Sequence, residues 1–201
     1  MNSKNQALIV IDAQNDFCSG GALAVAGGDD VVAGINAEMR KFNTVVFTQD
    51  WHPESHSSFA SSHSGMAAYE VIEMPYGRQI LWPDHCVQGS KGAAFHPSLE
   101  SNLAQNIIRK GFRRGIDSYS AFFENDHETA TGLTGYLKSR DVSGVTLVGL
   151  ALDFCVAFSA VDAASEGFDV TVISSLTRAI DLDGSLERAM NRMNEAGVKV
   201  V

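Results

Sequence analysis

The sequence predicts an α/β fold in which helices cover a doubly wound, mostly parallel sheet. Short apolar runs rich in β-branched residues alternate with segments of helical periodicity, which is typical of βαβ units. The run at residues 6–11 is continuously apolar, as expected of a central strand that is covered on both faces. The six expected strands are residues 6–11, 44–48, 106–109, 145–148, 170–173 and 198–201.

Four helices are expected between these strands, and long loops join them. Residues 52–97 lose regular periodicity and are dominated by Pro, Gly, Ser and His, so this stretch is expected to be a lid or a binding loop. Residues 18–30 and 111–124 are also expected to be loops. The expected helices are residues 30–41, 132–140, 155–167 and 182–196, the last with Asp181 as its cap.

The length and composition of the chain limit its architecture and its partners. With 201 residues, 45% hydrophobic and 19% charged, residues 1–201 are expected to form a single domain. A net charge of −9 opposes binding to nucleic acid or to anionic membranes and favours a small uncharged ligand. No apolar run approaches the ~20 residues that span a bilayer, and the N-terminus lacks a signal-peptide pattern, so a cytoplasmic protein is expected. These features are also compatible with a homo-oligomer.

The chain contains three cysteines, and one of them has an unusual position. An odd count predicts reduced thiols, with Cys18 and Cys86 expected to serve packing. Cys155 follows a predicted strand and a glycine turn at Gly149, and a helix begins beside it. Unpaired backbone N–H groups and the positive end of the helix dipole stabilise a thiolate at such a junction. The alternative is that Cys155 is a small buried hydrophobe.

Asp12, Asp50, Lys110 and Cys155 each follow a different predicted strand. Ligands of such sheets bind outside the carboxyl ends of the strands, so these groups are expected to converge at one edge. A thiol that attacks a carbonyl needs a proton acceptor, for which Asp12 is suited, and Lys110 is expected to lower the thiol pKa. The alternative is an ordinary ion pair between Asp12 and Lys110 that closes the strand ends.

A second group of side chains has the composition of a metal site. Asp50 and His52 are two residues apart in an extended segment and therefore face the same way. With His85 they form a carboxylate and two imidazoles, a set that suits one divalent ion, zinc first and iron or manganese next. His56 is a candidate fourth ligand. The alternative is that these are solvated loop residues.

Aromatic residues in the loops can form the walls of a site. Phe17, Trp82 and Tyr119 suit a flat ring, although loop aromatics are as often ordinary packing residues. His63 and His96 have no strong partner in the sequence and are expected to be surface residues.

Five motifs occur in an order that resembles one family. They are DAQNDF at residues 12–17, DWHP at 50–53, WPDHCVQGS at 82–90, KGF at 110–112 and the junction at Cys155. Together they resemble the bacterial nicotinamidases of the isochorismatase-like cysteine hydrolase superfamily, and the match covers most of the chain. The resemblance implies a three-layer, Rossmann-like α/β/α fold and a cis peptide between Leu150 and Ala151. Leu152 and Phe154 depart from the residues that are frequent in the family, so hydrogen bonding beside Cys155 is expected to differ.

The resemblance also implies roles for residues of this chain. It implies a catalytic triad of Asp12, Lys110 and Cys155, and an oxyanion hole from the backbone N–H groups of Ala151 and Cys155. The substrate-binding residues that it implies are Phe17, Leu23, Trp82 and Tyr119. The metal ligands that it implies are Asp50, His52 and His85, with His56 as the candidate fourth ligand.

The expected reaction is hydrolysis of nicotinamide to nicotinate and ammonia through a cysteine thioester, a step of NAD salvage. Pyrazinamide is expected to react as well, because it carries the same carboxamide on a similar ring. Three alternatives stay open: an amidase of the superfamily with another small carboxamide substrate, a non-haem iron oxygenase built on Asp50, His52 and His85, and a non-catalytic metal-binding protein.

Overall fold

A computed structural model describes residues 5–201; residues 1–4, which belong to the N-terminus where the sequence predicts no signal peptide, lie outside the described residues. Six strands form the main sheet in the order β5-β2-β1-β6-β7-β8, and every neighbouring pair is parallel. The prediction of a doubly wound parallel sheet is thereby confirmed. The strands are β1 (Gln6–Ile11), β2 (Thr44–Asp50), β5 (Asn106–Lys110), β6 (Gly144–Leu150), β7 (Asp169–Arg178) and β8 (Lys199–Val200).

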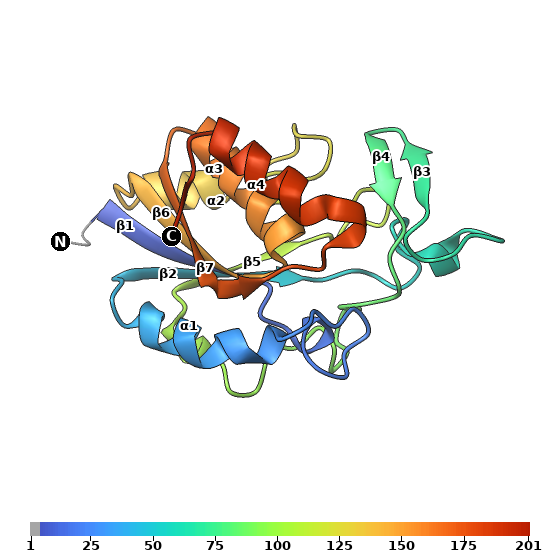
Figure 1. The fold of residues 1–201 in the computed structure, drawn as a ribbon, viewed down its shortest axis with the longest axis horizontal. Coiled ribbons are helices and arrows are strands. Elements are labelled where there is room, and N and C mark those ends of the chain that lie inside the picture. The colour runs from blue at the N-terminus through green and yellow to red at the C-terminus, as the bar shows by residue number, and fades with distance from the viewer. Residues whose placement is uncertain (1–4) are drawn as a thin grey trace.

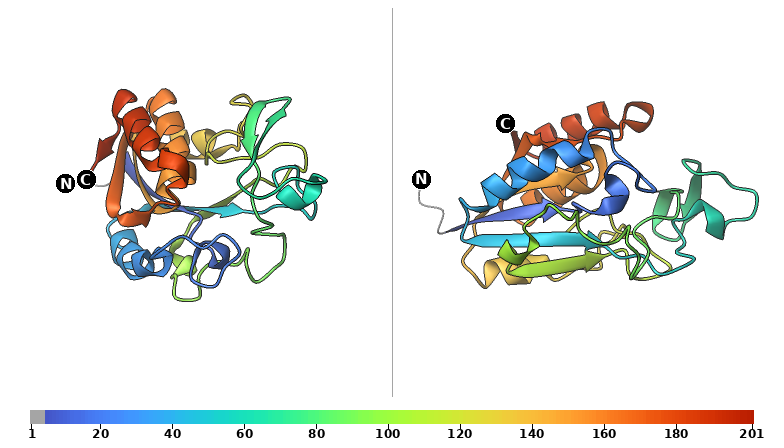
Figure 2. Two further views of the ribbon diagram at one scale, coloured as in Figure 1. Left: turned by 45° about the vertical axis from the view of Figure 1, so that its right-hand side comes forward. Right: turned by 90° about the horizontal axis from the view of Figure 1, so that it is seen from below.

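Helices cover both faces of this sheet and give the expected three layers (Figures 1 and 2). Helix α1 lies on one face, and α2, α3 and α4 lie on the other. In α1, buried Val31, Ile35 and Met39 are spaced four residues apart, which places them on the stripe that faces the sheet. The bounds are α1 (Val31–Met39), α2 (Leu133–Lys138), α3 (Ala157–Ser165) and α4 (Ser185–Glu195).

The strand order fixes where a ligand can bind. From β1 the chain builds outward through β2 and β5, and it then returns to the other side of β1 with β6. The order therefore reverses between β1 and β6, whose residues are almost all fully buried. Parallel sheets of this kind bind ligands in the crevice at the carboxyl ends beside such a reversal. Asp12 directly follows β1, and Ala151 directly follows β6.

The junction after β6 differs in detail from the expectation. Strand β6 continues through Gly149 to Leu150, so the predicted turn at Gly149 is wrong. Gly149 has a φ of 110°, and a Cβ atom there would collide with the carbonyl oxygen of Ile11 on β1. The Leu150–Ala151 peptide is cis. Cys155 lies in a π-helical turn, Leu152–Val156, that leads into α3.

The last third of the chain is more regular than expected. Strand β7 has ten residues, because its outer part pairs with Gly149 and Leu150 beyond an irregularity in the register. Asp181 was predicted to cap α4: it is not the residue that directly precedes the helix, but its Oδ1 accepts a long hydrogen bond of 3.4 Å from the Leu186 backbone N–H in the first turn. It adopts a left-handed conformation before a 3₁₀ turn, and Gly184 precedes the helix without a side-chain cap.

Residues 52–97 contain an antiparallel hairpin, so the expectation that this stretch lacks regular structure is wrong. Strands β3 (Val71–Met74) and β4 (Gly77–Ile80) pair around a turn at Pro75 and Tyr76. The hairpin lies apart from the main sheet, at the right of Figure 1. A two-residue turn between short apolar strands is a hairpin signal, but half-exposed strands of four residues produce only a weak pattern.

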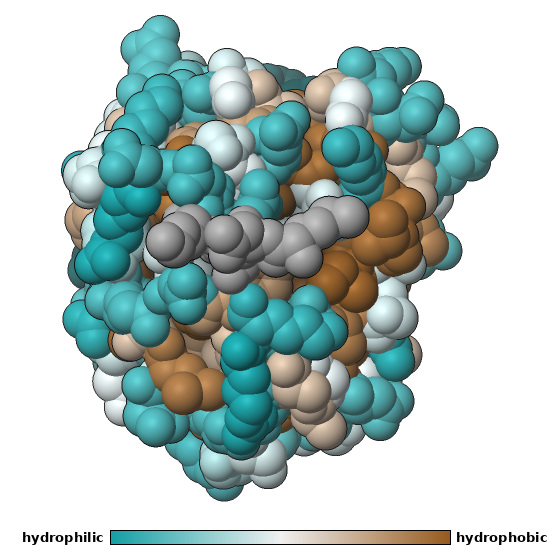
Figure 3. Space-filling model, turned by 90° about the vertical axis from the view of Figure 1, so that its left-hand side faces the viewer, coloured by the Kyte–Doolittle hydropathy of each residue, from teal (hydrophilic) through white to brown (hydrophobic). Residues whose placement is uncertain are grey.

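The face at the amino ends of the main strands, opposite the hairpin, mixes hydrophilic and apolar residues (Figure 3). Within residues 5–201, no helix is both long and apolar enough to cross a membrane.

Candidate active site

Four reactive side chains from four strand ends meet at the carboxyl edge of the sheet. The Lys110 ammonium nitrogen lies 2.8 Å from Asp12 Oδ2 and 3.4 Å from Cys155 Sγ, and it forms an ion pair with Asp50. It also donates to the carbonyl oxygen of Ser118 at 3.1 Å. All four side chains are nearly inaccessible to solvent. Lys110 is therefore the centre of this cluster.

The charges of the cluster do not balance, because two buried carboxylates share one ammonium. Burial would lower the pKa of Lys110, but Asp12 and Asp50 outweigh it and hold that pKa well above its usual value. Burial raises the pKa of Asp50 well above its ordinary range despite Lys110, and Asp12 raises it further. With both carboxyl groups ionised, one negative charge is left without a partner, which helps to raise the pKa of Asp50 and which a divalent cation would offset.

The Cys155 thiol does not have the lowered pKa that its position predicts. Burial raises the pKa of Cys155 well above 9; Lys110 opposes this effect, whereas Asp12 and Asp50 reinforce it. The expectation that Lys110 lowers the thiol pKa is right for that one interaction and wrong for the net effect. Cys155 is a protonated thiol at neutral pH in this arrangement, and it needs a base to become a nucleophile.

Asp12 is held in place by a contact between β1 and β2. The Thr48 hydroxyl donates to Asp12 Oδ1 at 2.6 Å, and the Asp12 backbone N–H donates to the same hydroxyl oxygen at 3.1 Å. One carboxylate oxygen of Asp12 and the Cys155 sulfur lie within 4.8 Å of each other. Asp12 is thus positioned to exchange a proton with Cys155.

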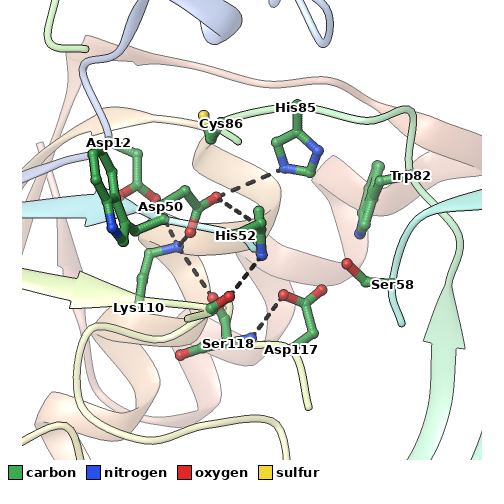
Figure 4. A network of polar contacts seen from close by, with 12 residues as sticks. Asp12, Asp50, His52, Ser58, Trp82, His85, Cys86, Lys110, Asp117 and Ser118 are labelled. Carbon is green, nitrogen blue, oxygen red and sulfur yellow. Dashed lines mark hydrogen bonds and ion pairs between the residues drawn. The ribbon is translucent and has the colours of Figure 1, made fainter. Parts of the chain in front are cut away.

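The carboxylate of Asp50 also faces two imidazoles (Figure 4). His52 Nε2 and His85 Nε2 each lie 3.8 Å from Asp50 Oδ2. The Nδ1 atoms lie 2.9 Å from the Gly111 carbonyl oxygen and 2.8 Å from the Pro83 carbonyl oxygen, respectively. A ring that donates from Nδ1 to a carbonyl keeps the Nε2 lone pair free for a metal.

Protonation of the two imidazoles is disfavoured, which suits metal binding. Burial lowers the pKa of His52 well below 6.5, and the neighbouring His85 contributes to that shift. Burial also lowers the pKa of His85. Two neutral imidazoles and one carboxylate, beside an excess of negative charge, fit a divalent ion such as zinc, iron or manganese.

The structure places His56 beside His52, but it groups His56 with His52 and Asp117, whose ligand atoms lie within 4.8 Å of one another, rather than with Asp50 and His85. The two ring centroids are 4.5 Å apart. His56 Nδ1 lies 2.7 Å from the Ser58 hydroxyl, and Nε2 lies 2.8 Å from the Arg113 carbonyl oxygen. Both nitrogens of His56 are therefore engaged in hydrogen bonds of the protein itself rather than directed at Asp50.

A small pocket lies directly over these groups. Its walls include every residue that the sequence assigns to the substrate, together with both predicted oxyanion residues and the three predicted metal ligands. Sequence reasoning missed Asp117 and Ile180 and did not assign Phe154 to the pocket. The lining residues are Phe17, Leu23, Asp50, His52, Trp82, His85, Asp117, Tyr119, Ala151, Phe154, Cys155 and Ile180.

Gln79 of the β3–β4 hairpin anchors one wall of the pocket. This side chain is fully buried, and its amide nitrogen donates to Asp117 Oδ2 at 3.0 Å and to the Tyr119 hydroxyl at 3.1 Å. The indole N–H of Trp82 donates to the same hydroxyl at 3.1 Å. Sequence reasoning missed Gln79, because a polar residue in an expected loop carries no signal of burial.

The fold and the site define a class of protein: α/β enzymes that combine a buried thiol, a carboxylate and an ammonium with a set of metal ligands at the reversal of the strand order. Comparison with known families makes this specific. The chain belongs to the isochorismatase family, because the model of the isochorismatase domain matches residues 6–201. The predicted family is thereby confirmed.

Three solved structures resemble the chain along almost its whole length. A nicotinamidase/pyrazinamidase of Acinetobacter baumannii is 53% identical with a TM-score of 0.97, covering 98% of this chain and 96% of that one. PnC1 of L. infantum in complex with nicotinate is 41% identical with a TM-score of 0.86, covering 100% and 93%. A pyrazinamidase of Pyrococcus horikoshii in complex with zinc is 34% identical with a TM-score of 0.79, covering 98% of both chains.

Proposed function

We propose that the protein is a nicotinamidase that hydrolyses nicotinamide to nicotinate and ammonia and that also deamidates pyrazinamide. We also propose that residues 1–201 form one domain. The similarity to a nicotinamidase/pyrazinamidase at 53% identity supports this substrate class. The observation that carries the proposal is the position of the Lys110 ammonium, which contacts Asp12 and the Cys155 sulfur in one buried cluster. That cluster supplies a base, a cation and a nucleophile at the floor of an aromatic pocket.

The first half of the reaction forms a thioester. Asp12 takes the proton from Cys155, which the raised pKa of the thiol makes necessary, and the sulfur attacks the carboxamide carbon. The backbone N–H groups of Ala151 and Cys155 hold the negative charge that develops on the carbonyl oxygen; removing one such donor typically costs ~10²–10³ in rate. Asp12 returns its proton to the amide nitrogen as the C–N bond breaks, and ammonia leaves.

The second half releases the acid. Asp12 takes a proton from water, which attacks the thioester carbon. When the C–S bond breaks, Asp12 gives that proton back to the Cys155 sulfur, and nicotinic acid is released, which loses its carboxyl proton to the solvent as nicotinate. Lys110 stays charged throughout because of its two carboxylates, and it holds Asp12 in line with the sulfur.

Asp50, His52 and His85 would hold one divalent ion, and the zinc complex of the Pyrococcus horikoshii relative makes zinc the first choice. Such an ion supplies a Lewis acid to which a pyridine or pyrazine nitrogen can bind, which would fix the ring relative to Cys155. Phe17, Leu23, Trp82 and Tyr119 surround the ring and exclude water from it.

The test is ammonia release by the purified protein from nicotinamide, pyrazinamide and benzamide. Benzamide is the matched control, because it keeps the ring size and the carboxamide but lacks a ring nitrogen. We expect turnover of the first two, and a much higher KM for benzamide. Turnover of none of them, or an equal KM for benzamide and nicotinamide, would contradict the proposed substrate class.

A further inference from the structure

A second group of metal-ligating atoms lies outside the pocket. Cys18, Asp29 and His96 each present a ligand atom, and the three atoms lie within 4.8 Å of one another. They come from separate segments: Cys18 follows the 3₁₀ turn Asn15–Phe17, Asp29 precedes α1, and His96 belongs to a loop before β5. His96 is not the unpartnered surface residue that the sequence suggested, because its side chain is only 17% exposed and its Nε2 lies 3.4 Å from Asp29 Oδ1.

The carboxylate of Asp29 has one oxygen directed at His96. The Ser19 backbone N–H and hydroxyl donate to Asp29 Oδ2 at 2.9 and 2.5 Å, so Oδ1 is the oxygen that faces His96. Ligands with bonds of about 2.0 Å to a tetrahedral ion are about 3.3 Å apart. The separation of 3.4 Å between Asp29 Oδ1 and His96 Nε2 matches that edge.

The distance between the ligand atoms of Asp29 and His96 is shorter than the corresponding distances among the metal ligands of the pocket. The two imidazoles there lie 3.8 Å from the carboxylate oxygen of Asp50, which is farther than the distance between His96 and Asp29. The thiol of Cys18 adds a softer donor, and its residue is 98% buried. A sulfur, a nitrogen and an oxygen donor select zinc or cobalt(II) over magnesium or calcium.

We propose that Cys18, Asp29 and His96 form a second divalent-metal site, specific for zinc-like cations and separate from the metal ligands of the proposed amidase pocket. Binding replaces the thiol proton of Cys18, and one proton is released for each ion bound. The Ser98 backbone N–H donates to His96 Nδ1 at 3.2 Å, so the free ring carries its proton on Nε2. Coordination at Nε2 moves that proton to Nδ1 and opens the contact with Ser98.

An ion at this site would fasten two loops that support the pocket wall. The Asn15 and Asp16 backbone N–H groups already donate to the Ala94 and Gly92 carbonyl oxygens, both at 3.0 Å. Phe17, which lines the pocket, is the residue next to Cys18. Metal bound by Cys18, Asp29 and His96 would therefore restrain one pocket wall without touching Cys155.

Cobalt(II) can report this site specifically, because only a thiolate ligand gives a sulfur-to-cobalt charge-transfer band in the near ultraviolet. The titration uses the folded Cys155→Ala protein, since Cys155 also lies near two carboxylates. We expect that protein to bind a second equivalent of cobalt with this band. Adding Cys18→Ser should remove both the band and the second equivalent.

Two histidine variants on the same Cys155→Ala background complete the experiment. His96→Gln should weaken cobalt binding at the second site at least tenfold, whereas His63→Gln, the matched control, should leave it unchanged. A single bound equivalent without the band, or a band that survives Cys18→Ser, would overturn the proposal. If Cys18→Ser does not fold, unchanged cobalt affinity in His96→Gln would overturn it as well.

Discussion

The carboxyl edge of the sheet and the segment 52–97 supply different parts of the pocket by different means. At the edge, strand pairing sets the positions: Asp50 and Lys110 are direct partners in the register of β2 and β5. In residues 52–97, a hairpin and irregular loops deliver Trp82, His85 and the buried Gln79. The reactive groups therefore lie at the ends of the regular sheet, whereas one part of the pocket wall comes from the least regular part of the fold.

The largest effect is expected at the edge. Cys155→Ala should lower ammonia release from nicotinamide by more than about a thousandfold, because no other group can form the thioester. Nicotinamide binding, measured by calorimetry, should persist, since the pocket walls are unchanged. Retained turnover would mean that the edge does not supply the nucleophile.

The next effect joins the two regions, because His85 comes from the irregular segment and faces Asp50 at the edge. His85→Ala should lower metal affinity beyond the about 10- to 100-fold that is typical of changes to residues supporting a ligand. Metal content after dialysis measures this effect, and His63→Ala is the matched control. Equal metal content in the two variants would show that His85, and with it the irregular segment, does not contribute to metal binding.

Because the Cys155 thiol is protonated, its rate of alkylation should depend on pH. Because burial raises the thiol pKa well above 9, the thiolate fraction, and with it alkylation by iodoacetamide, should rise about tenfold per pH unit from pH 7 to 9. The rate can be followed by mass spectrometry of the peptide that contains Cys155. A rate of alkylation that stays constant over this range would show that the Cys155 thiol is already ionised at pH 7 and needs no base to form the thiolate.

A smaller effect is expected from the anchor of the irregular wall. Gln79→Leu removes the donor shared by Asp117 and Tyr119, so KM for nicotinamide should rise several-fold while kcat changes little. Gln88→Leu is the control, because Gln88 is exposed and its side chain donates only to the Trp51 carbonyl oxygen. A fall in kcat with constant KM would show that Gln79 acts on the reactive groups at the carboxyl edge of the sheet rather than on substrate binding.

The smallest effect concerns stability. Val71 on the hairpin is 44% exposed, so Val71→Ala should change the free energy of unfolding by no more than about 0.5 kcal/mol. Ile9 in β1 is fully buried, and Ile9→Ala should cost ~2–5 kcal/mol. Urea unfolding measures both, and similar losses would show that the hairpin is part of the cooperative core.

The same contrast explains how far the sequence could predict this molecule. Buried parallel strands produce continuous apolar runs, so the sheet and the convergence of Asp12, Asp50, Lys110 and Cys155 at its edge followed from pattern alone. The hairpin escaped prediction because its strands are short and half-exposed, and with it Gln79 was missed.

Two further features depend on contacts that sequence spacing does not contain. The thiol pKa is set by the burial of Cys155 among three charges, so the dipole argument predicted the wrong direction. Ile180 reaches the pocket because it follows the long strand β7, whose outer half lies beyond the predicted run at residues 170–173.

We propose that Cys155 attacks the carbonyl carbon of a pyridine carboxamide, and an aldehyde of the same shape tests this step. Pyridine-3-carboxaldehyde keeps the ring and the carbonyl but has no leaving group, so attack stops at a stable thiohemiacetal. With the aldehyde carbon labelled with ¹³C, we predict an NMR signal of a tetrahedral carbon bonded to sulfur in the unmodified protein and none in Cys155→Ala. A bound aldehyde that stays trigonal in the unmodified protein would contradict the claim.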